Sequence, residues 1–241
     1  MKLIKNYDEI NKISKACQLI SEVHQKVGLL NFRGMTEMQV SEFIMKCIHD
    51  LNISELAFPV IVGSGVRSLI LHAEPTEKII EDNDLVLIDM GLKYNGYCSD
   101  MTRTYSANGQ MTEEQKEIEN IVRTAQQEFL NSISKKQSLS SLHDIAKNSL
   151  CRGLDAAGPR DCYDIQKIYP HKTSHWIGQD VHDQCAYIDE LGQPILLKAG
   201  MCFTVEPGLY IQNTNTKYDG IGIRIEDVVV VTDDGFDILS V

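Results

Sequence analysis

The 241-residue sequence predicts an α+β fold made of two similar α/β halves that face each other. In each half, two amphipathic helical patterns precede two apolar strand patterns. Each of these strands carries one carboxylate, and residues 201–210 repeat the pattern of residues 85–94. If this repeat is real, each half contributes two acids to a shared site.

The first half is predicted to open with two core-packing helices. Residues 7–27 carry an apolar stripe at helical spacing, and Gly28 follows as a C-terminal cap. A second helix is expected from about Thr36 to Leu51, because Thr36 and Gln39 form a capping box. An apolar strand is then expected at residues 56–62, and a further apolar run ends at His72.

Residues 85–105 are predicted to form two adjacent antiparallel strands. The first is an apolar run that ends at Asp89, and the second, 97–105, alternates and carries Asp100. The polar link 93–96 between them is a hairpin signal. A carboxylate at the end of a buried strand is costly unless a cation or several hydrogen bonds compensate it, so this pair outlines a metal site.

The second half is predicted to begin with two more helices. The first spans 112–133 and opens with a capping box between Thr112 and Gln115. The second spans 141–157 and stops at the Gly158-Pro159 pair. The polar link 135–138 between them is the best candidate for a midpoint of the chain.

Two acids in the second half match those of the first. Glu206 and Glu226 are the counterparts of Asp89 and Asp100, and residues 171–183, which precede these strands in the second half, concentrate three histidines. Four converging carboxylates would repel one another severely in a partly buried site. Two divalent metals would neutralise them, and a bridging hydroxide would then form near neutral pH.

Isolated ion pairs are the alternative explanation of these acids, with Arg103, Arg224 and lysines as partners. Strand alternation separates the two arginines. Arg224 has the parity of Glu226 and should face the site, whereas Arg103 has the opposite parity to Asp100 and should act structurally.

The three histidines of residues 171–183 are also predicted to differ in placement. His171 and His175 share a face in either a helix or a strand, whereas His182 needs a turn, which Gly178 can provide.

Composition excludes several classes of partner. The formal net charge of -11 and the pI near 5.1 argue against nucleic acid and anionic membranes. No apolar run has the length of a membrane span, and the N-terminus shows no secretory signal. Seven cysteines without a CxxC pair predict reduced thiols and a cytoplasmic location. A thiol nucleophile paired with a histidine stays open, although no local pattern favours it.

Five segments together resemble the successive motifs of the aminopeptidase P and prolidase branch of the pita-bread metallopeptidases. They are LVLIDMG, YCSDMTRTY, HKTSHWIGQDVHD, TVEPGLY and GIGIRIEDVVVV, and the resemblance covers essentially the whole chain. It implies a curved, mainly antiparallel sheet with helices outside. We therefore expect one catalytic domain over residues 1–241, with pseudo-halves of about 1–135 and 136–241 and without the family's usual N-terminal domain.

The resemblance also implies a dinuclear metal site. Asp89 should bind one metal only, Asp100 and Glu226 should bridge both, and His175 and Glu206 should complete the shell of the other. Manganese is the metal expected first, with cobalt, zinc and iron as alternatives.

On the substrate side, the resemblance implies roles for three further histidines and an arginine. His72, His171 and His182 should position the scissile peptide, and Arg224 should meet a substrate carboxylate or support the metal ligands. Glu206 should serve as proton shuttle, while His182 and His72 stabilise developing charge.

The implied reaction is metal-hydroxide attack on the carbonyl before proline, which releases the N-terminal residue of a peptide with proline in second position. Three alternatives stay open: a prolidase-type dipeptidase, a methionine aminopeptidase-like enzyme and a pita-bread binding module without catalysis. The length fits methionine aminopeptidase, but the HxxxHWxGxDVHD pattern is not its usual motif. A homo-oligomer is neither predicted nor excluded.

Overall fold

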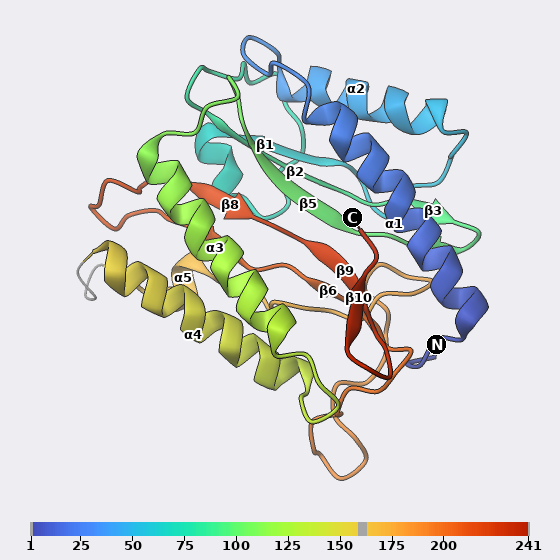
Figure 1. The fold of residues 1–241 in the computed structure, drawn as a ribbon. Coiled ribbons are helices and arrows are strands. Elements are labelled where there is room, and N and C mark those ends of the chain that lie inside the picture. The colour runs from blue at the N-terminus through green and yellow to red at the C-terminus, as the bar shows by residue number, and fades with distance from the viewer. Residues whose placement is uncertain (1, 159–162, 241) are drawn as a thin grey trace.

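The computed structural model describes residues 2–158 and 163–240 and has the predicted α+β architecture. Figure 1 shows the four long helices on one side of the strands, with α1 and α2 over one end and α3 and α4 over the other. Pro159, expected to help stop the fourth helix, lies outside the described residues. The two helix pairs thus lie over different groups of strands, although Ile13 and Cys17 of α1 also cluster with strand residues of the second half such as Cys202.

The first two helices, α1 (Tyr7–Val27) and α2 (Glu37–Asp50), begin at capping boxes. Asn6 caps α1, and the predicted pair Thr36 and Gln39 caps α2. The buried faces of both helices form one hydrophobic cluster with the first group of strands. The apolar stripes read from the sequence therefore mark the faces that pack on the sheet.

The strands of the first half form a three-stranded antiparallel sheet and a small hairpin. The sheet has the order β1-β2-β5, and β3 pairs with β4 in the segment between β2 and β5. The elements are β1 (Ile61–Ser64), the 3-10 helix η1 (Gly65–Leu69), β2 (Leu85–Met90), β3 (Lys93–Tyr94), β4 (Tyr97–Cys98) and β5 (Met101–Ser106).

Two strand predictions in this half need correction. The strand expected at 56–62 begins only at Ile61, because Pro59 has no N–H to give to a ladder. The strand expected at 97–105 is broken at Ser99, whose backbone and hydroxyl bind Leu92 instead of the neighbouring strand. This break takes Asp100 out of the regular ladder.

The second half has a similar order, with two long helices before its strands, but it adds a short third helix and a final strand. Its elements are α3 (Glu113–Asn131), α4 (Leu139–Ala157), α5 (Ile165–Ile168), β6 (Cys202–Val205), β7 (Gly208–Tyr210), β8 (Gly222–Arg224), β9 (Asp227–Val231) and β10 (Phe236–Ile238). Thr112 and Gln115 cap α3 as predicted. Helix α4 begins two residues earlier than expected, because Ser138 rather than a later serine is its N-cap.

The two halves repeat each other in topology. The antiparallel pair β6–β9 encloses the small pair β7–β8, as β2–β5 encloses β3–β4. An antiparallel bridge between Trp176 and Phe203 lies beside β6, where β1 lies beside β2 in the first half. The repeat predicted between residues 85–94 and 201–210 is therefore present in the structure. The division at 135/136 stays a prediction, and α3 and α4 on either side of it pack together.

The halves are joined along β5, β8 and β9. The hydroxyl of Thr104 donates to the carbonyl of Arg224 at 3.1 Å, and the amide of Glu226 donates to the carbonyl of Thr102 at 3.1 Å. These bonds place the predicted acids of the two halves on adjacent strands.

A buried carboxylate ties α2 to the segment that leads to His72. Glu37 is fully buried and accepts hydrogen bonds from the amides and hydroxyls of Ser64 and Thr76. Arg67 pairs with the same carboxylate at 3.0 Å. Because each carboxylate oxygen has several donors, the burial of this charge is compensated.

The described residues bear on two predictions, the absence of a membrane span and the reduced state of the cysteines. None of their helices is long and apolar enough to cross a membrane. The six cysteines that the structure describes are free thiols, and Cys162 lies outside that part of the chain.

A buried histidine links α1 to β5. The Nε2 of His24 lies 2.9 Å from the carbonyl of Met101, and its Nδ1 lies 2.9 Å from the hydroxyl of Tyr105. The carbonyl can only accept, so Nε2 carries the proton and Nδ1 accepts from the tyrosine. Burial lowers the pKa of His24 to about 3, so the ring stays neutral in the folded protein.

This histidine should make the protein acid-sensitive. Its folded pKa of about 3 lies below its unfolded value of about 6.5, so the unfolded chain alone takes up the proton as the pH falls through this window. From pH 7 to pH 5, the wild type should lose about 2 kcal/mol more unfolding free energy than a His24→Gln variant. Urea unfolding at the two pH values measures this difference, and parallel losses in both proteins would contradict it.

Candidate metal centre

Four acids occupy equivalent ends of the two strand pairs. Asp89 lies near the end of β2 and Asp100 directly precedes β5, while Glu206 directly follows β6 and Glu226 directly precedes β9. Since β2–β5 and β6–β9 are both antiparallel, each pair of acids lies at one end of its ladder. The join between the halves then brings the two ends together.

Three of the predicted metal ligands form a compact cluster. Asp100, His175 and Glu226 each offer one ligand atom, and these atoms all lie within 4.8 Å of one another. The Nε2 of His175 is 3.4 Å from Asp100 Oδ2 and 3.5 Å from Glu206 Oε1. Glu206 therefore lies at the edge of the cluster, and Asp89 lines the same cleft.

Burial and mutual repulsion disfavour the charged form of these acids. Burial raises the pKa of Asp100 well above its usual range, and the charges of Asp89 and Glu206 raise it further. The pKa of Glu226 is also well above its usual range, through burial and then Asp100 and Glu206. Burial raises the pKa of Glu206, although His175 opposes the rise. Such a group of acids is stable in its charged form only when a cation is added.

The donor set fits a divalent cation of the first transition row. Within the described part of the chain, Asp89 Oδ1 and Asp100 Oδ1 are buried without a hydrogen-bond partner. Unpartnered carboxylate oxygens beside an imidazole are the ligands preferred by manganese, cobalt, iron and zinc. The residues present therefore fit the metal that the sequence predicts.

Isolated ion pairs explain only one of the four acids. Arg224 pairs with Asp89 at 2.8 Å, but Arg103 pairs with Asp227 at 2.7 Å instead of with an acid of the cluster. Arg103 also donates to the backbone carbonyl of Glu226 at 2.6 Å. As strand parity predicted, Arg224 faces the site and Arg103 is structural.

Arg224 is buried with all its nitrogens engaged. Its Nε donates to the hydroxyl of Thr102, its Nη1 to the hydroxyl of Tyr210, and its Nη2 to Asp89. Thr102 in turn donates to Glu226 Oε2 at 2.7 Å. This geometry supports a role in holding the acids rather than in meeting a substrate carboxylate.

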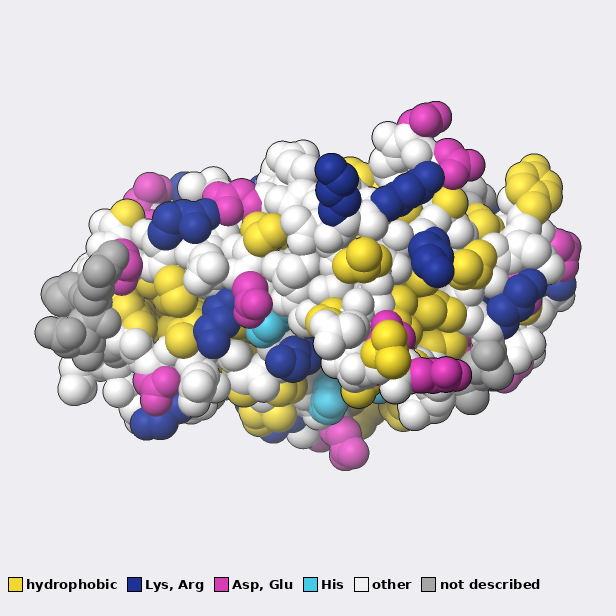
Figure 2. All heavy atoms as spheres, turned by 90° about the horizontal axis from the view of Figure 1, so that it is seen from below, with side chains coloured by type: hydrophobic (Ala, Val, Ile, Leu, Met, Phe, Trp, Pro, Cys, Tyr) yellow, Lys and Arg dark blue, Asp and Glu magenta, His cyan; other side chains and the backbone are white. Residues whose placement is uncertain are grey.

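The four histidines predicted from sequence surround one cleft of about 730 Å³. It is lined by the acids, by Arg224, by His72, His171, His175 and His182, and by apolar side chains that include Phe58, Leu71 and Val181. Figure 2 shows histidine side chains at the surface near the middle of the face seen from below. The acids and the histidines thus line the same hollow.

His171 is held as a neutral imidazole. Its Nδ1 lies 2.8 Å from the carbonyl of Lys172, and its Nε2 lies 2.9 Å from the hydroxyl of Tyr210. Since Arg224 donates to that hydroxyl, the tyrosine donates its own proton to Nε2. Burial lowers the pKa of His171 to about 4, which agrees with a neutral ring.

His182 reaches the cleft through a turn, as predicted. The amide of Asp183 donates to the carbonyl of Trp176 at 2.9 Å, so the chain folds back around Gly178. The ring of His182 then meets that of His175 at a centroid distance of 4.3 Å, edge to face. Burial and the neighbouring His175 lower the pKa of His182.

Sequence reasoning missed two hydroxyl groups of the site, those of Thr102 and Tyr210. Thr102 lies two residues after Asp100, and Tyr210 lies four residues after Glu206. In a strand, each would therefore point to the same face as its acid. The same alternation that placed Arg224 could have indicated both.

Comparison with known proteins gives consistent matches. A family model described as metallopeptidase family M24 matches residues 11–233. The Xaa-Pro aminopeptidase of Escherichia coli (strain K12) is 34% identical over 249 residues, which cover 98% of this chain and 55% of that protein. The Xaa-Pro aminopeptidase of Haemophilus influenzae is 32% identical, and the match covers 100% of this chain and 58% of that protein. The chain thus spans little more than half the length of these relatives.

Solved structures of similar proteins agree with the observed fold. Pseudomonas aeruginosa aminopeptidase PepP has a TM-score of 0.93 at 32% identity, over 99% of this chain and 56% of that one. A complex of Escherichia coli aminopeptidase P with substrate has a TM-score of 0.92 at 32% identity, over 100% and 57%. These similarities confirm the predicted pita-bread fold and the resemblance to aminopeptidase P.

Replacing Asp100 should relieve the repulsion and remove the response to metal. Because the folded pKa of Asp100 is raised, its ionisation destabilises the metal-free protein as the pH rises. Metal-free Asp100→Asn should therefore unfold at a higher temperature than the metal-free wild type at pH 7.5, with a smaller difference at pH 5.

Manganese at about 100 times its dissociation constant should add about 2.7 kcal/mol to the wild type and much less to the variant. Thermal unfolding with EDTA or Mn²⁺ measures both effects. Equal stabilisation of the two proteins by Mn²⁺ would contradict the assignment of Asp100 as a ligand.

Proposed function

Because the chain belongs to metallopeptidase family M24, we propose that it is a metal-dependent exopeptidase that cleaves the peptide bond before proline. It would release the N-terminal residue from peptides with proline in second position. The relatives named Xaa-Pro aminopeptidase and the aminopeptidase P structures support this specificity.

One observation carries the proposal more than any other. Asp100, Glu226 and Glu206 lie around His175 in a cleft open to a peptide, with pKa values raised by burial. A structural role does not need acids held in this destabilised state, whereas a cation site does.

The five predicted ligands would hold two divalent cations. In this assignment Asp100 and Glu226 would serve both cations, His175 and Glu206 would complete the ligands of one, and Asp89 would belong to the other. Manganese is proposed first, with cobalt, zinc and iron as alternatives. Two such cations would neutralise the acids, polarise the scissile carbonyl and make a bound water more acidic.

Glu206 would move the proton during hydrolysis. Its Oε1 lies 3.5 Å from His175 Nε2 and its Oε2 lies 3.8 Å from His171 Nδ1, at the edge of the cluster. From there it would accept a proton from the attacking water and pass it to the proline nitrogen as the C–N bond breaks. His72 and His182 line the same cleft and would stabilise the charge that develops on the carbonyl oxygen.

His171 and Arg224 would set the geometry of the substrate side. The neutral His171 can contact the peptide without adding charge, and Arg224 keeps Asp89 and Tyr210 in place. A cytoplasmic location is part of the same proposal, supported by seven cysteines without a CxxC pair.

Replacing Glu206 with glutamine should abolish turnover without unfolding the protein. The side chain keeps its size but loses the ability to accept a proton, so kcat should fall by about 100-fold or more. Hydrolysis of an Xaa-Pro-Pro peptide with Mn²⁺ measures kcat, and elemental analysis gives the metal content.

A matched control is Glu113→Gln, at an exposed position in the first turn of α3, which should leave kcat unchanged. Near-normal turnover by Glu206→Gln would contradict the role assigned to Glu206.

Substrate length should distinguish the proposed activity from that of a dipeptidase. We expect Gly-Pro-Pro to be cleaved and Gly-Pro to be a poor substrate, because an aminopeptidase uses contacts beyond the proline. A Met-Ala-Ser peptide tests the methionine aminopeptidase alternative and should not be cleaved. Preference for Gly-Pro would indicate a prolidase-type dipeptidase instead.

A further inference from the structure

The ring of His182 is placed by its backbone rather than by bonds of its own. It packs edge to face on His175 at 4.3 Å, and its carbonyl accepts a hydrogen bond from Gln184 at 3.0 Å. In the described part of the chain, no hydrogen bond to the His182 ring is found. The position of the His182 ring therefore depends on the contacts that hold the neighbouring backbone in place.

The residue after His182, Asp183, is held by an ion pair with a residue near the N-terminus. Lys5 Nζ lies 2.6 Å from Asp183 Oδ2, although 178 residues separate the two in sequence. The two side chains are only 3% and 2% exposed. Lys5 Nζ also donates to the carbonyl of Lys2 at 2.6 Å, so the charge is held at a fixed point.

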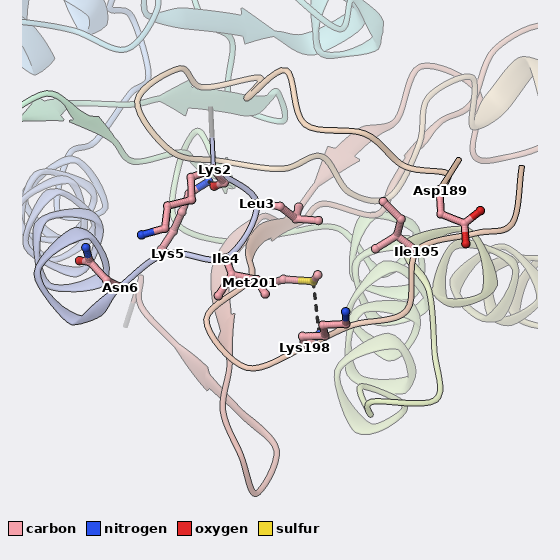
Figure 3. Close-up of a pocket in the computed structure, with 9 residues that line it drawn as sticks. All are labelled: Lys2, Leu3, Ile4, Lys5, Asn6, Asp189, Ile195, Lys198 and Met201. Carbon is pink, nitrogen blue, oxygen red and sulfur yellow. Dashed lines mark hydrogen bonds between the residues drawn. The ribbon is translucent and has the colours of Figure 1, made fainter. Parts of the chain in front are cut away.

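Both ends of this ion pair fit closely into their surroundings. The amide of Lys5 donates to the carbonyl of Gly200 at 2.8 Å, and a Cβ at Gly200 would lie 2.7 Å from the Lys5 carbonyl. Figure 3 shows this N-terminal segment, with Ile4 beside Met201. At the other end, a Cβ at Gly178 would lie 2.9 Å from Lys5 Nζ and would overlap Asp183. The backbone at Lys5 is thus fixed to Gly200. The ammonium group of Lys5 is fixed to Asp183, in the turn that carries His182.

We propose that Lys5 is a positioning residue that holds His182 over the cleft through Asp183. A buried pair contributes little net stability compared with apolar side chains of the same volume, but it defines one arrangement of the chain that carries it. Asp183 Oδ1 has no partner in the described residues, so the Lys5 contact restrains the side chain of Asp183, while its amide bond to the Trp176 carbonyl closes the turn. This inference rests on the proposed function for its effect on catalysis, but not for the anchoring itself.

Hydrogen exchange tests the anchoring without any assay of activity. In Lys5→Met, backbone amides of residues 177–185 should exchange at least about 10-fold faster than in the wild type, while amides of 78–84 should not change. The matched control is Lys78→Met, because Lys78 pairs with Asp84 at the same 2.6 Å. It should leave residues 177–185 unchanged. Unchanged exchange there in Lys5→Met would overturn the proposal.

Kinetics in two backgrounds test whether Lys5 acts through His182. Lys5→Met should lower kcat by about 10- to 100-fold with KM within about two-fold, since the loss is one of geometry in the transition state. In a His182→Ala background the same substitution should change kcat by less than about two-fold. An equal loss in both backgrounds would overturn the proposal. A wild-type chain without activity would contradict the proposed function, and the exchange experiment would then decide alone.

A second variant covers the case in which Lys5→Met does not fold. Lys5→Met combined with Asp183→Leu removes both charges, so the penalty of an unpaired buried carboxylate disappears and the thermal midpoint should recover. Exchange at 177–185 should stay fast and kcat should stay low, because the anchor is still missing. Recovery of wild-type exchange and kcat would show that the pair acts on stability only.

Discussion

Repulsion among buried carboxylates is the constraint on which this structure depends. Asp100, Glu226 and Glu206 lie around His175. Burial raises the pKa of each acid, and the nearby charge of Asp89 raises all three further. The fold cannot relax by moving them apart, because the backbones of β5 and β9 are bonded to each other at Thr102. The free energy that packing provides thus holds the acids together, and a bound cation would recover it.

The repeated topology explains how such a site arises from simple elements. Each half contributes one antiparallel pair that encloses a smaller pair, and each pair ends in two acids. All of this is encoded by local signals: strand alternation, turn residues, and capping boxes such as those at Thr36 and Thr112. For that reason, the helices, the repeat and the position of each acid could be predicted from the sequence.

Other features could not be predicted, because the contacts that create them have no local signal. Thr102 reaches Glu226 over 124 residues, and Lys5 reaches Asp183 over 178 residues. Strand alternation places Thr102 on the face of Asp100, but threonine and lysine are usually exposed. Nothing in the sequence neighbourhood of Thr102 or Lys5 identifies a distant buried partner. The break in the strand at Ser99 likewise depends on a bond to another segment rather than on its own propensity.

The charges in the cleft are shared among Arg224, the acids around His175 and the histidines. The guanidinium of Arg224 pairs with Asp89 and donates to Tyr210, and its charge also lowers the pKa of Asp100 and Glu206. Burial nevertheless leaves the pKa of both acids raised. Tyr210 also contacts His171 at 2.9 Å, and burial lowers the pKa of this histidine to about 4, so its ring stays neutral. The cleft therefore combines acids whose charged form a cation would stabilise with an uncharged imidazole, whose Nδ1 lies 3.8 Å from Glu206 Oε2.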